Sequence, residues 1–294
     1  MTVAPNPPLD PISGQRHIVR LVNPRSPMPE RMQYNHTRKA GNRGDVWKHF
    51  LLVTVIDRLE VPERFQYVDV HSGAPLHELQ PKGEWTSGIG KVLTECTALK
   101  HTAYFEIASS HVTNRQYPAA WWFAMTRLTL RSRYVNLTLT DTAEDVAHRY
   151  DERYLPVLPA NVSLSFSRDD GFRRVEDLSE ADLVVLDPPF SPDAAADWKR
   201  IAVASRQLLK RQIKFLAWYP LFSVSNPKRL VDATDCSGWE VIWAQFGPKP
   251  SQNLKGCGIL ASPELVETFQ RSRNSLKSLA SCLGGNLNVR LRTA

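Results

Sequence analysis

A carboxylate, two prolines and an aromatic ring stand together at Asp187-Pro188-Pro189-Phe190, directly after the apolar run 181–186. The run predicts a buried strand over 183–187, and the prolines prevent the strand from continuing, so these groups lie at its carboxyl end. Ligands of open α/β sheets bind at that edge. The Asp187 carboxylate and the Pro188 carbonyl can accept both hydrogens of an exocyclic amine, and the Phe190 ring offers a face to a flat heterocycle. The motif favours methylation of a base amino group over the alternative, a rigid turn.

A second group of side chains, nearer the amino terminus, has the types that bind phosphate. Four basic residues fall in one short stretch in which Asp45 is the one acid, and two ring-bearing residues precede them: Arg38, Lys39, Arg43, Lys48, Tyr34 and His36. This cluster predicts an edge that tracks a phosphate backbone, although a solvated helix entrance has the same composition. Over the whole chain, 37 basic against 30 acidic residues give a net charge of +7, which favours a polyanionic partner.

The composition is that of a soluble globular protein, with 294 residues, 42% of them hydrophobic and 23% charged. No apolar run approaches the roughly 20 residues of a membrane-spanning helix, and no secretory signal pattern is present. We therefore expect a cytoplasmic monomer without a membrane partner. The four cysteines lie far apart and form no Cys-x-x-Cys pair, so we expect buried thiols, with neither a metal site nor a disulfide framework: Cys96, Cys236, Cys257 and Cys282.

The chain divides into a tail, one large domain and a second short tail. Residues 1–31 are rich in proline and poor in large apolar residues, which predicts a disordered segment. We expect the domain to span 32–284 and a C-terminal tail to occupy 285–294. At the start of the domain, Asp45 is a good N-cap for a largely buried helix that ends near Leu59.

An insertion subdomain is expected at about 75–131. More than about sixty residues separate the strands predicted at 65–70 and 134–140, far beyond the dozen that a crossover needs. The insertion reads as helical around 89–99 and 119–130. Its cluster Trp121-Trp122-Phe123 has the chemistry to stack on bases, but we favour packing in the core.

Strand and helix patterns alternate along the rest of the domain. We expect helices at 142–153 and 193–209, and strands at 162–166, 213–218, 239–246 and 258–261. The alternation predicts an α/β fold with a mainly parallel, doubly wound sheet, and the last two strands predict a terminal hairpin.

Six motifs together resemble those of the RlmJ-type 23S ribosomal RNA adenine-N6 methyltransferases. They are Tyr34-Asn35-His36, Ala40-Gly41-Asn42-Arg43-Gly44-Asp45-Val46-Trp47-Lys48-His49, Asp69-Val70-His71-Ser72-Gly73, Asp170-Gly171-Phe172, Asp187-Pro188-Pro189-Phe190 and Trp218-Tyr219-Pro220. Their order and spacing also agree, and they cover the chain from about residue 32 to 280. The resemblance implies a Rossmann-like, S-adenosylmethionine (SAM)-dependent methyltransferase sheet, N6-methylation of an adenine in 23S rRNA, SAM as cofactor and no metal.

The resemblance also implies a role for each matched residue. Asp187, Pro188 and Phe190 would be catalytic, by holding the adenine amine and stacking on the base. Six residues would bind SAM, the last two of them at its adenine and Asp141 only as a substitute for an acid that is not matched: His49, His71, Gly73, Asp141, Asp170 and Gly171. Three would face the substrate: Tyr34, His36 and Lys48. For the histidines, a buried and hydrogen-bonded packing role is the alternative, and Asp-Gly is also a common turn.

The sequence departs from the family pattern on the cofactor side. The expected His-Ala-Gly-x-Gly loop is His71-Ser72-Gly73-Ala74-Pro75, and proline has a fixed φ and no N–H to donate. The acid expected at the end of the second strand is Thr138 or Thr140, with Asp141 as a shifted substitute. In the insertion, a Tyr-Pro-Gly-Ser-Pro string becomes Tyr117-Pro118-Ala119-Ala120-Trp121. These changes predict weak or altered cofactor binding.

Three functional hypotheses remain open from the sequence. The first is methylation of an adenine in RNA, whose loops present unstacked bases without the cost of opening a duplex. The second is methylation of DNA adenine or another amine. The third is a degenerate homologue that binds RNA without catalysis, and cofactor affinity separates it from the other two.

Overall fold

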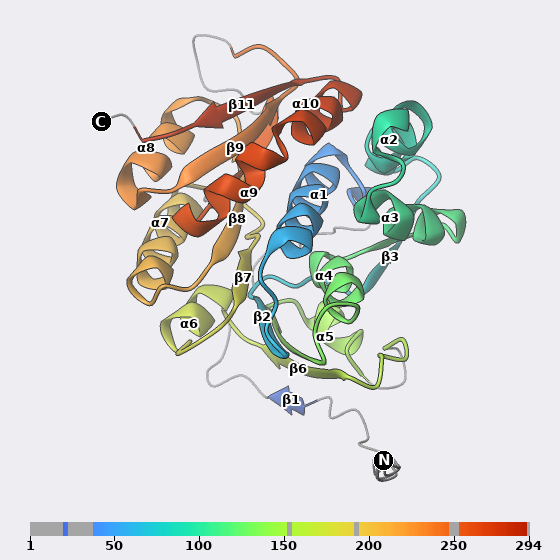
Figure 1. The fold of residues 1–294 in the computed structure, drawn as a ribbon, viewed down its shortest axis with the longest axis vertical. Coiled ribbons are helices and arrows are strands. Elements are labelled where there is room, and N and C mark those ends of the chain that lie inside the picture. The colour runs from blue at the N-terminus through green and yellow to red at the C-terminus, as the bar shows by residue number, and fades with distance from the viewer. Residues whose placement is uncertain (1–19, 23–37, 152–154, 191–193, 247–252, 293–294) are drawn as a thin grey trace, which may run out of the picture.

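A computed structural model describes residues 20–22, 38–151, 155–190, 194–246 and 253–292. Figure 1 shows a central sheet with helices on both faces. The strands are β1 (Arg20–Val22), β2 (Arg64–Asp69), β3 (Leu76–Glu78), β4 (Gln116–Pro118), β5 (Tyr134–Asp141), β6 (Val162–Arg168), β7 (Leu183–Leu186), β8 (Phe215–Leu221), β9 (Ser237–Ile242), β10 (Gly256–Ala261) and β11 (Asn286–Arg290). The helices are α1 (Arg43–Arg58), α2 (Ile89–Glu95), α3 (Ala103–Thr113), α4 (Ala120–Leu128), α5 (Glu144–His148), α6 (Gly171–Glu176), α7 (Ala194–Lys210), α8 (Ser225–Thr234), α9 (Val266–Arg271) and α10 (Arg273–Cys282), with short 3-10 turns η2 (Glu84–Thr86), η3 (Thr97–Leu99) and η4 (Pro263–Leu265).

The described part of the main sheet has nine strands in the order β1-β6-β5-β2-β7-β8-β10-β9-β11. The pairs from β1 to β8 are parallel, whereas β10 is antiparallel to both β8 and β9, and β11 is antiparallel to β9. This is a doubly wound, Rossmann-like sheet, extended at one edge by the antiparallel strands β10, β9 and β11. The fold predicted from the sequence is therefore confirmed, including its terminal hairpin.

Two hydrophobic clusters cover the two faces of the sheet. Along β7, Leu183 and Val185 belong to the cluster under α1, α4, α9 and α10, whereas Val184 and Leu186 belong to the cluster under α6, α7 and α8. Successive strand side chains point to opposite faces, so a run that is apolar at every position needs helices on both sides. A fully buried side chain of this size contributes about 2 kcal/mol, so burial on both faces holds β7 within the centre of the sheet.

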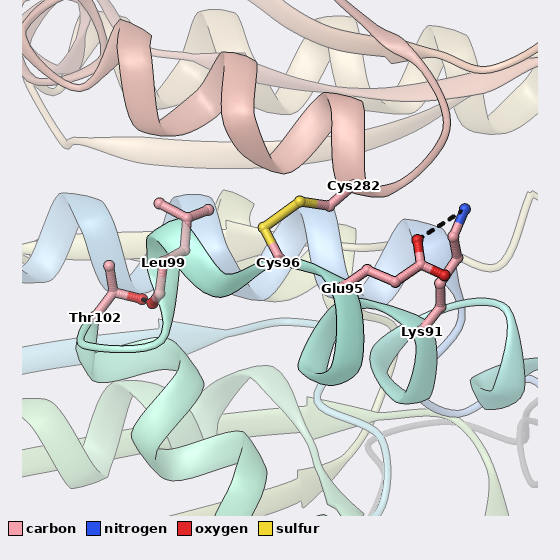
Figure 2. The surroundings of a disulfide bond; sticks show 6 residues. All are labelled: Lys91, Glu95, Cys96, Leu99, Thr102 and Cys282. Carbon is pink, nitrogen blue, oxygen red and sulfur yellow. Dashed lines mark hydrogen bonds and ion pairs between the residues drawn. A yellow bond between two sulfur atoms is a disulfide. The ribbon is translucent and has the colours of Figure 1, made fainter.

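The segment between β2 and β5 is the expected insertion and is joined to the C-terminal helices by a disulfide. It contains a two-stranded antiparallel sheet, β3–β4, and the helices α2, α3 and α4. Trp121 and Phe123 are fully buried, which confirms their packing role. Cys96, after α2, is bonded to Cys282 at the end of α10, 186 residues away (Figure 2). The expectation of four buried thiols was thus wrong for this pair and correct for Cys236 and Cys257.

Other boundaries also differ from those expected. Helix α1 starts at Arg43 because the N-cap is Asn42, whose side chain accepts a hydrogen bond from the Asp45 N–H. The segment 285–294 is not simply a tail, since β11 pairs with β9. Within the proline-rich segment, β1 pairs with β6. Both edge strands are short, so their pairing depends on backbone hydrogen bonds that a hydrophobicity pattern does not record.

Candidate functional site

The Asp187 carboxylate lies just beyond β7 and is paired with a buried lysine. Lys48, from the first turns of α1, forms an ion pair with Asp187 and a second with Asp45, at 3.2 Å between Nζ and Oδ1. Burial opposes the lysine charge, but the two carboxylates outweigh it and raise the pKa of Lys48. The lysine is therefore a fixed cation that holds Asp187 in place.

Contacts at the start of α1 position Lys48. Asp45 lies one helical turn before Lys48 and accepts the Gly41 N–H at 3.0 Å, so its carboxylate is itself held. Gly41 has φ +73°, and a Cβ there would meet Ile89 Cγ2 at 2.9 Å. Only glycine combines that φ with that close approach. The Ala-Gly-Asn motif thus positions Lys48 through backbone geometry.

Phe190 adopts a strained backbone within an aromatic cluster. Its φ is +44°, a left-handed conformation that costs a residue with a side chain about 1–2 kcal/mol. The ring makes edge contacts with Trp198 of α7 and Trp218 of β8, at centroid distances of 5.2 and 5.7 Å. Packing between these two rings stabilises the strained turn and directs the aromatic face. Trp198 was not identified from the sequence.

His71 connects the ends of β2 and β7. Its Nδ1 accepts the Asp187 N–H at 3.3 Å, and its ring packs edge-on against Phe172 at 4.9 Å. The backbone N–H of His71 donates to one oxygen of the Asp69 carboxylate at 3.2 Å, and the Tyr67 hydroxyl donates to the other oxygen at 3.3 Å. Asp69 is 1% exposed, and burial raises its pKa to about 7. The Asp187 carboxylate contributes to that rise.

The altered glycine loop is held by hydrogen bonds from within the protein. Gly73, at φ +63°, donates its N–H to Asp141 at 3.0 Å and accepts the Tyr150 hydroxyl at 2.7 Å. Asp141 also accepts the Ala143 N–H at 2.9 Å, and its burial raises its pKa. Pro75 is buried, and its carbonyl accepts the Ala119 N–H at 3.1 Å. Proline therefore leads the chain into the insertion at the position where the family has a second glycine.

Asp170 and Gly171 form the start of α6 beside β2. The Asp170 carboxylate caps the helix by accepting the Phe172 N–H at 3.0 Å, and it is paired with Arg200 of α7. Partial burial alone would raise the pKa of Asp170, but Arg200 outweighs it and lowers that pKa. A Cβ on Gly171 would lie 1.8 Å from the Val70 carbonyl oxygen, so no other residue fits.

Arg200 is a site residue that sequence reasoning missed. Its guanidinium lies 4.2 Å from the centroid of the Phe172 ring while it pairs with Asp170. The contact joins α7 to α6 across a sequence separation of 30 residues. No local motif marks Arg200; only its place early in the helix expected at 193–209 could have placed it near the sheet edge.

Four predicted residues remain to be placed: His49, Tyr34, His36 and Pro188. His49 is 2% exposed and packs against the insertion, where its Nδ1 is 3.1 Å from the Tyr117 hydroxyl and its ring 4.9 Å from Phe123. These contacts are those of the buried packing role that we gave as the alternative to cofactor binding for His49. Tyr34 and His36 lie outside the described residues. Pro188 is buried beside Asp187.

Two cavities are lined by other residues. One of about 470 Å³ lies between α1, α3 and α10, and one of about 280 Å³ lies before α1, lined by Arg38, Lys39, Lys82 and Glu84. Within the described residues, no three His, Cys, Asp or Glu side chains converge as metal ligands would. None of the described helices is long and apolar enough to cross a membrane.

Known proteins provide an independent comparison. No family model matches the chain. Proteins named ribosomal RNA large subunit methyltransferase J from Haemophilus influenzae and Escherichia coli are each 24% identical, over 247 and 242 residues, and each alignment covers 76% of this chain and 83% of the relative. A solved structure of a Legionella pneumophila protein shares the fold, with a TM-score of 0.69 and 19% identity over 86% of this chain and 98% of that one. The resemblance to the RlmJ family is confirmed, and the chain is a divergent relative of those proteins.

Proposed function

We propose that this protein is a SAM-dependent methyltransferase that methylates the N6 amine of an adenine in ribosomal RNA, with 23S rRNA as the favoured substrate. The observation that carries the proposal is the Asp187 carboxylate at the carboxyl edge of the sheet, held by the buried Lys48 and followed by the Phe190 ring. The relatives named ribosomal RNA large subunit methyltransferase J support the substrate class.

In the proposed reaction, the protein localises a poorly nucleophilic lone pair. The adenine amine donates one hydrogen to Asp187 and the other to the Pro188 carbonyl, while Phe190 stacks on the base. Gripping both hydrogens turns the nitrogen lone pair away from the ring and toward the methyl group. Alignment at about 3 to 3.5 Å then supplies several kcal/mol of the barrier. The nitrogen would gain the methyl carbon as the bond from that carbon to the sulfonium sulfur breaks, leaving a neutral thioether. The nitrogen would then lose a proton, for which Asp187 is the acceptor already in contact.

The residues at the neighbouring strand ends fit the chemistry of SAM. Among the described residues, a Cβ built on Gly73 would meet the His77 ring alone, at 3.8 Å, so this part of the chain leaves room above the glycine. Asp141 and Asp170 stand at the ends of the next two strands, where carboxylates can accept ribose hydroxyls and an adenine amine. These residues and Gly171 would hold the cofactor, which supplies the methyl group when bound.

Two measurements test the proposal. Calorimetry with SAM should detect binding, and incubation with 23S rRNA fragments and labelled SAM should yield N6-methyladenosine, identified by mass spectrometry of the digested RNA. A DNA strand of the same sequence is the matched control for the alternative substrate class. Undetectable binding at millimolar SAM would contradict the proposal and favour the RNA-binding homologue, whereas methylation of the DNA strand alone would favour a DNA adenine substrate.

A further inference from the structure

A basic hollow lies next to the helix that delivers Lys48. It has a volume of about 280 Å³, and its lining carries three cationic side chains and one carboxylate: Arg38, Lys39, Lys82 and Glu84. Arg38 and Lys39 come from the segment before α1, and Lys82 comes from the insertion, more than forty residues later. The lining therefore has a net charge of about +2, contributed by two distant parts of the chain.

Close backbone contacts hold these two parts together. The Ile89 N–H donates to the Gly41 carbonyl at 2.8 Å, and a Cβ on Gly88 would lie 2.1 Å from the same oxygen. A Cβ on Gly83 would lie 3.4 Å from the Arg38 carbonyl oxygen. The Asn42 side chain, the N-cap of α1, donates a hydrogen bond to the Glu84 carboxylate at 3.4 Å. One oxygen of the single acid in the lining is therefore bonded to a neutral amide. These contacts fix the two segments that line the hollow relative to each other.

We propose that this hollow binds a backbone phosphate of the RNA substrate, with Lys82 as a contact supplied by the insertion. The proposal rests on the proposed function. A helix rises about 1.5 Å per residue, so the first residue of α1, Arg43, lies about 8 Å along the helix axis from the backbone of Lys48. Because the hollow adjoins this end of α1, a phosphate bound in it would belong to the same stretch of RNA as the proposed target adenine. Lysine binds phosphate as a point charge and needs no fixed geometry to do so.

The test compares two exposed lysines of the insertion. Lys82→Gln and Lys100→Gln remove the same charge, but Lys100 lies after η3 and does not line the hollow. RNA binding should be measured by fluorescence anisotropy on the full chain between about 50 and 200 mM salt. We expect Lys82→Gln to weaken binding about 3- to 10-fold near 100 mM salt and to lower the slope of log K against log salt by about one. Lys100→Gln should bind like the unmodified protein.

The outcomes separate this inference from the proposed function. If Lys82→Gln binds RNA as Lys100→Gln does, the hollow is not a phosphate site, even if the protein methylates RNA. If Lys82→Gln weakens binding as expected but the unmodified protein transfers no methyl group, the phosphate site stands and the proposed enzymatic activity fails. Where transfer occurs, the effect of Lys82→Gln should appear in KM for RNA, with kcat within twofold. Melting temperatures of both variants confirm that each is folded.

Discussion

The two ends of the candidate site hold their carboxylates in different ways. At the end formed by Asp187, Pro188 and Phe190, which we call the amine-binding end, the carboxylate is paired with Lys48 from a distant helix. At the end formed by Gly73, Asp141, Asp170 and Gly171, which we call the cofactor-binding end, the carboxylates accept nearby backbone N–H groups, and Asp170 also pairs with Arg200.

This difference indicates what each end has to preserve. A side-chain cation fixes the Asp187 carboxylate while leaving lone pairs free for an amine. Bonds from Asp141 to backbone N–H groups instead hold a loop in which proline has replaced a glycine, so that carboxylate supports the site's own structure. We therefore expect changes at the amine-binding end to affect the transfer step and changes at the cofactor-binding end to affect SAM affinity.

The largest effect should come from Asp187. Asp187→Asn and Asp187→Ala remove the anionic acceptor for the amine, so single-turnover methyl transfer should fall by about 1000-fold, while SAM affinity measured by calorimetry stays within threefold. Glu180→Gln, an exposed acid just before β7, is the matched control and should leave both unchanged. An equal loss of SAM affinity in Asp187→Asn would erase the distinction between the two ends.

Lys48→Gln should cause the next largest change, in stability. It leaves Asp45 and Asp187 without their shared buried cation, and we expect the free energy of unfolding to fall by about 3 kcal/mol in urea titrations. The double variant Asp45→Asn/Lys48→Gln removes one uncompensated charge and should recover part of the loss. No loss in the single variant would show that the ion pairs are not what holds the amine-binding end.

Asp69 lies between the two ends and should give stability a pH dependence. Its folded pKa of about 7 is raised above the unfolded value of about 3.9, so between about pH 4 and 7 the folded state keeps a proton that the unfolded chain has lost. Its contribution to stability therefore falls as pH rises through this window, by at most about 1.4 kcal/mol per pH unit. Urea titrations at pH 5, 6, 7 and 8 should show the free energy of unfolding of Asp69→Asn rising relative to that of the unmodified protein as pH increases. If the two free energies change with pH in parallel, the assignment is contradicted.

The smallest of these effects should appear at the cofactor-binding end. Asp141→Asn loses a charged acceptor for the Gly73 and Ala143 N–H groups, which is worth about 1.4 kcal/mol, so SAM affinity should weaken about tenfold. The transfer rate at saturating SAM should stay within threefold. If the rate at saturation falls instead, the loop contributes to the alignment of the methyl group as well as to affinity.

The sheet could be predicted from the sequence because its central strands are buried on both faces. Residues Leu183–Leu186 are apolar at every position, and such a run in an alternating α/β pattern is typical of a strand buried on both faces. The ends of these strands then placed Asp69, Asp141, Asp170 and Asp187 on one edge. The contact between Lys48 and Asp187 joins residues 139 apart, and no feature of the sequence indicated it. The resemblance implied only that Lys48 faces the substrate, whereas the side chain is buried and ion-paired.

The features that sequence reasoning missed depend on contacts between distant segments. Helix α3 and the paired strands β3 and β4 lie within the insertion, and β11 pairs at the edge of the sheet, but none of them has a periodic pattern strong enough to mark it. Arg200 forms its ion pair with Asp170 only when α7 packs against α6. Spacing alone also gave no reason to pair Cys96 with Cys282, because a disulfide requires proximity in space.

The bond between Cys96 and Cys282 turns the polypeptide that it encloses into a closed ring. That ring contains most of the candidate site, from Asp141 to Trp218. A protease that cuts the ring once leaves a single covalent molecule, which separates into two fragments only after a thiol is added. Digested samples run on gels with and without reductant would therefore differ, and an apparently intact band without reductant can conceal a broken backbone inside the ring.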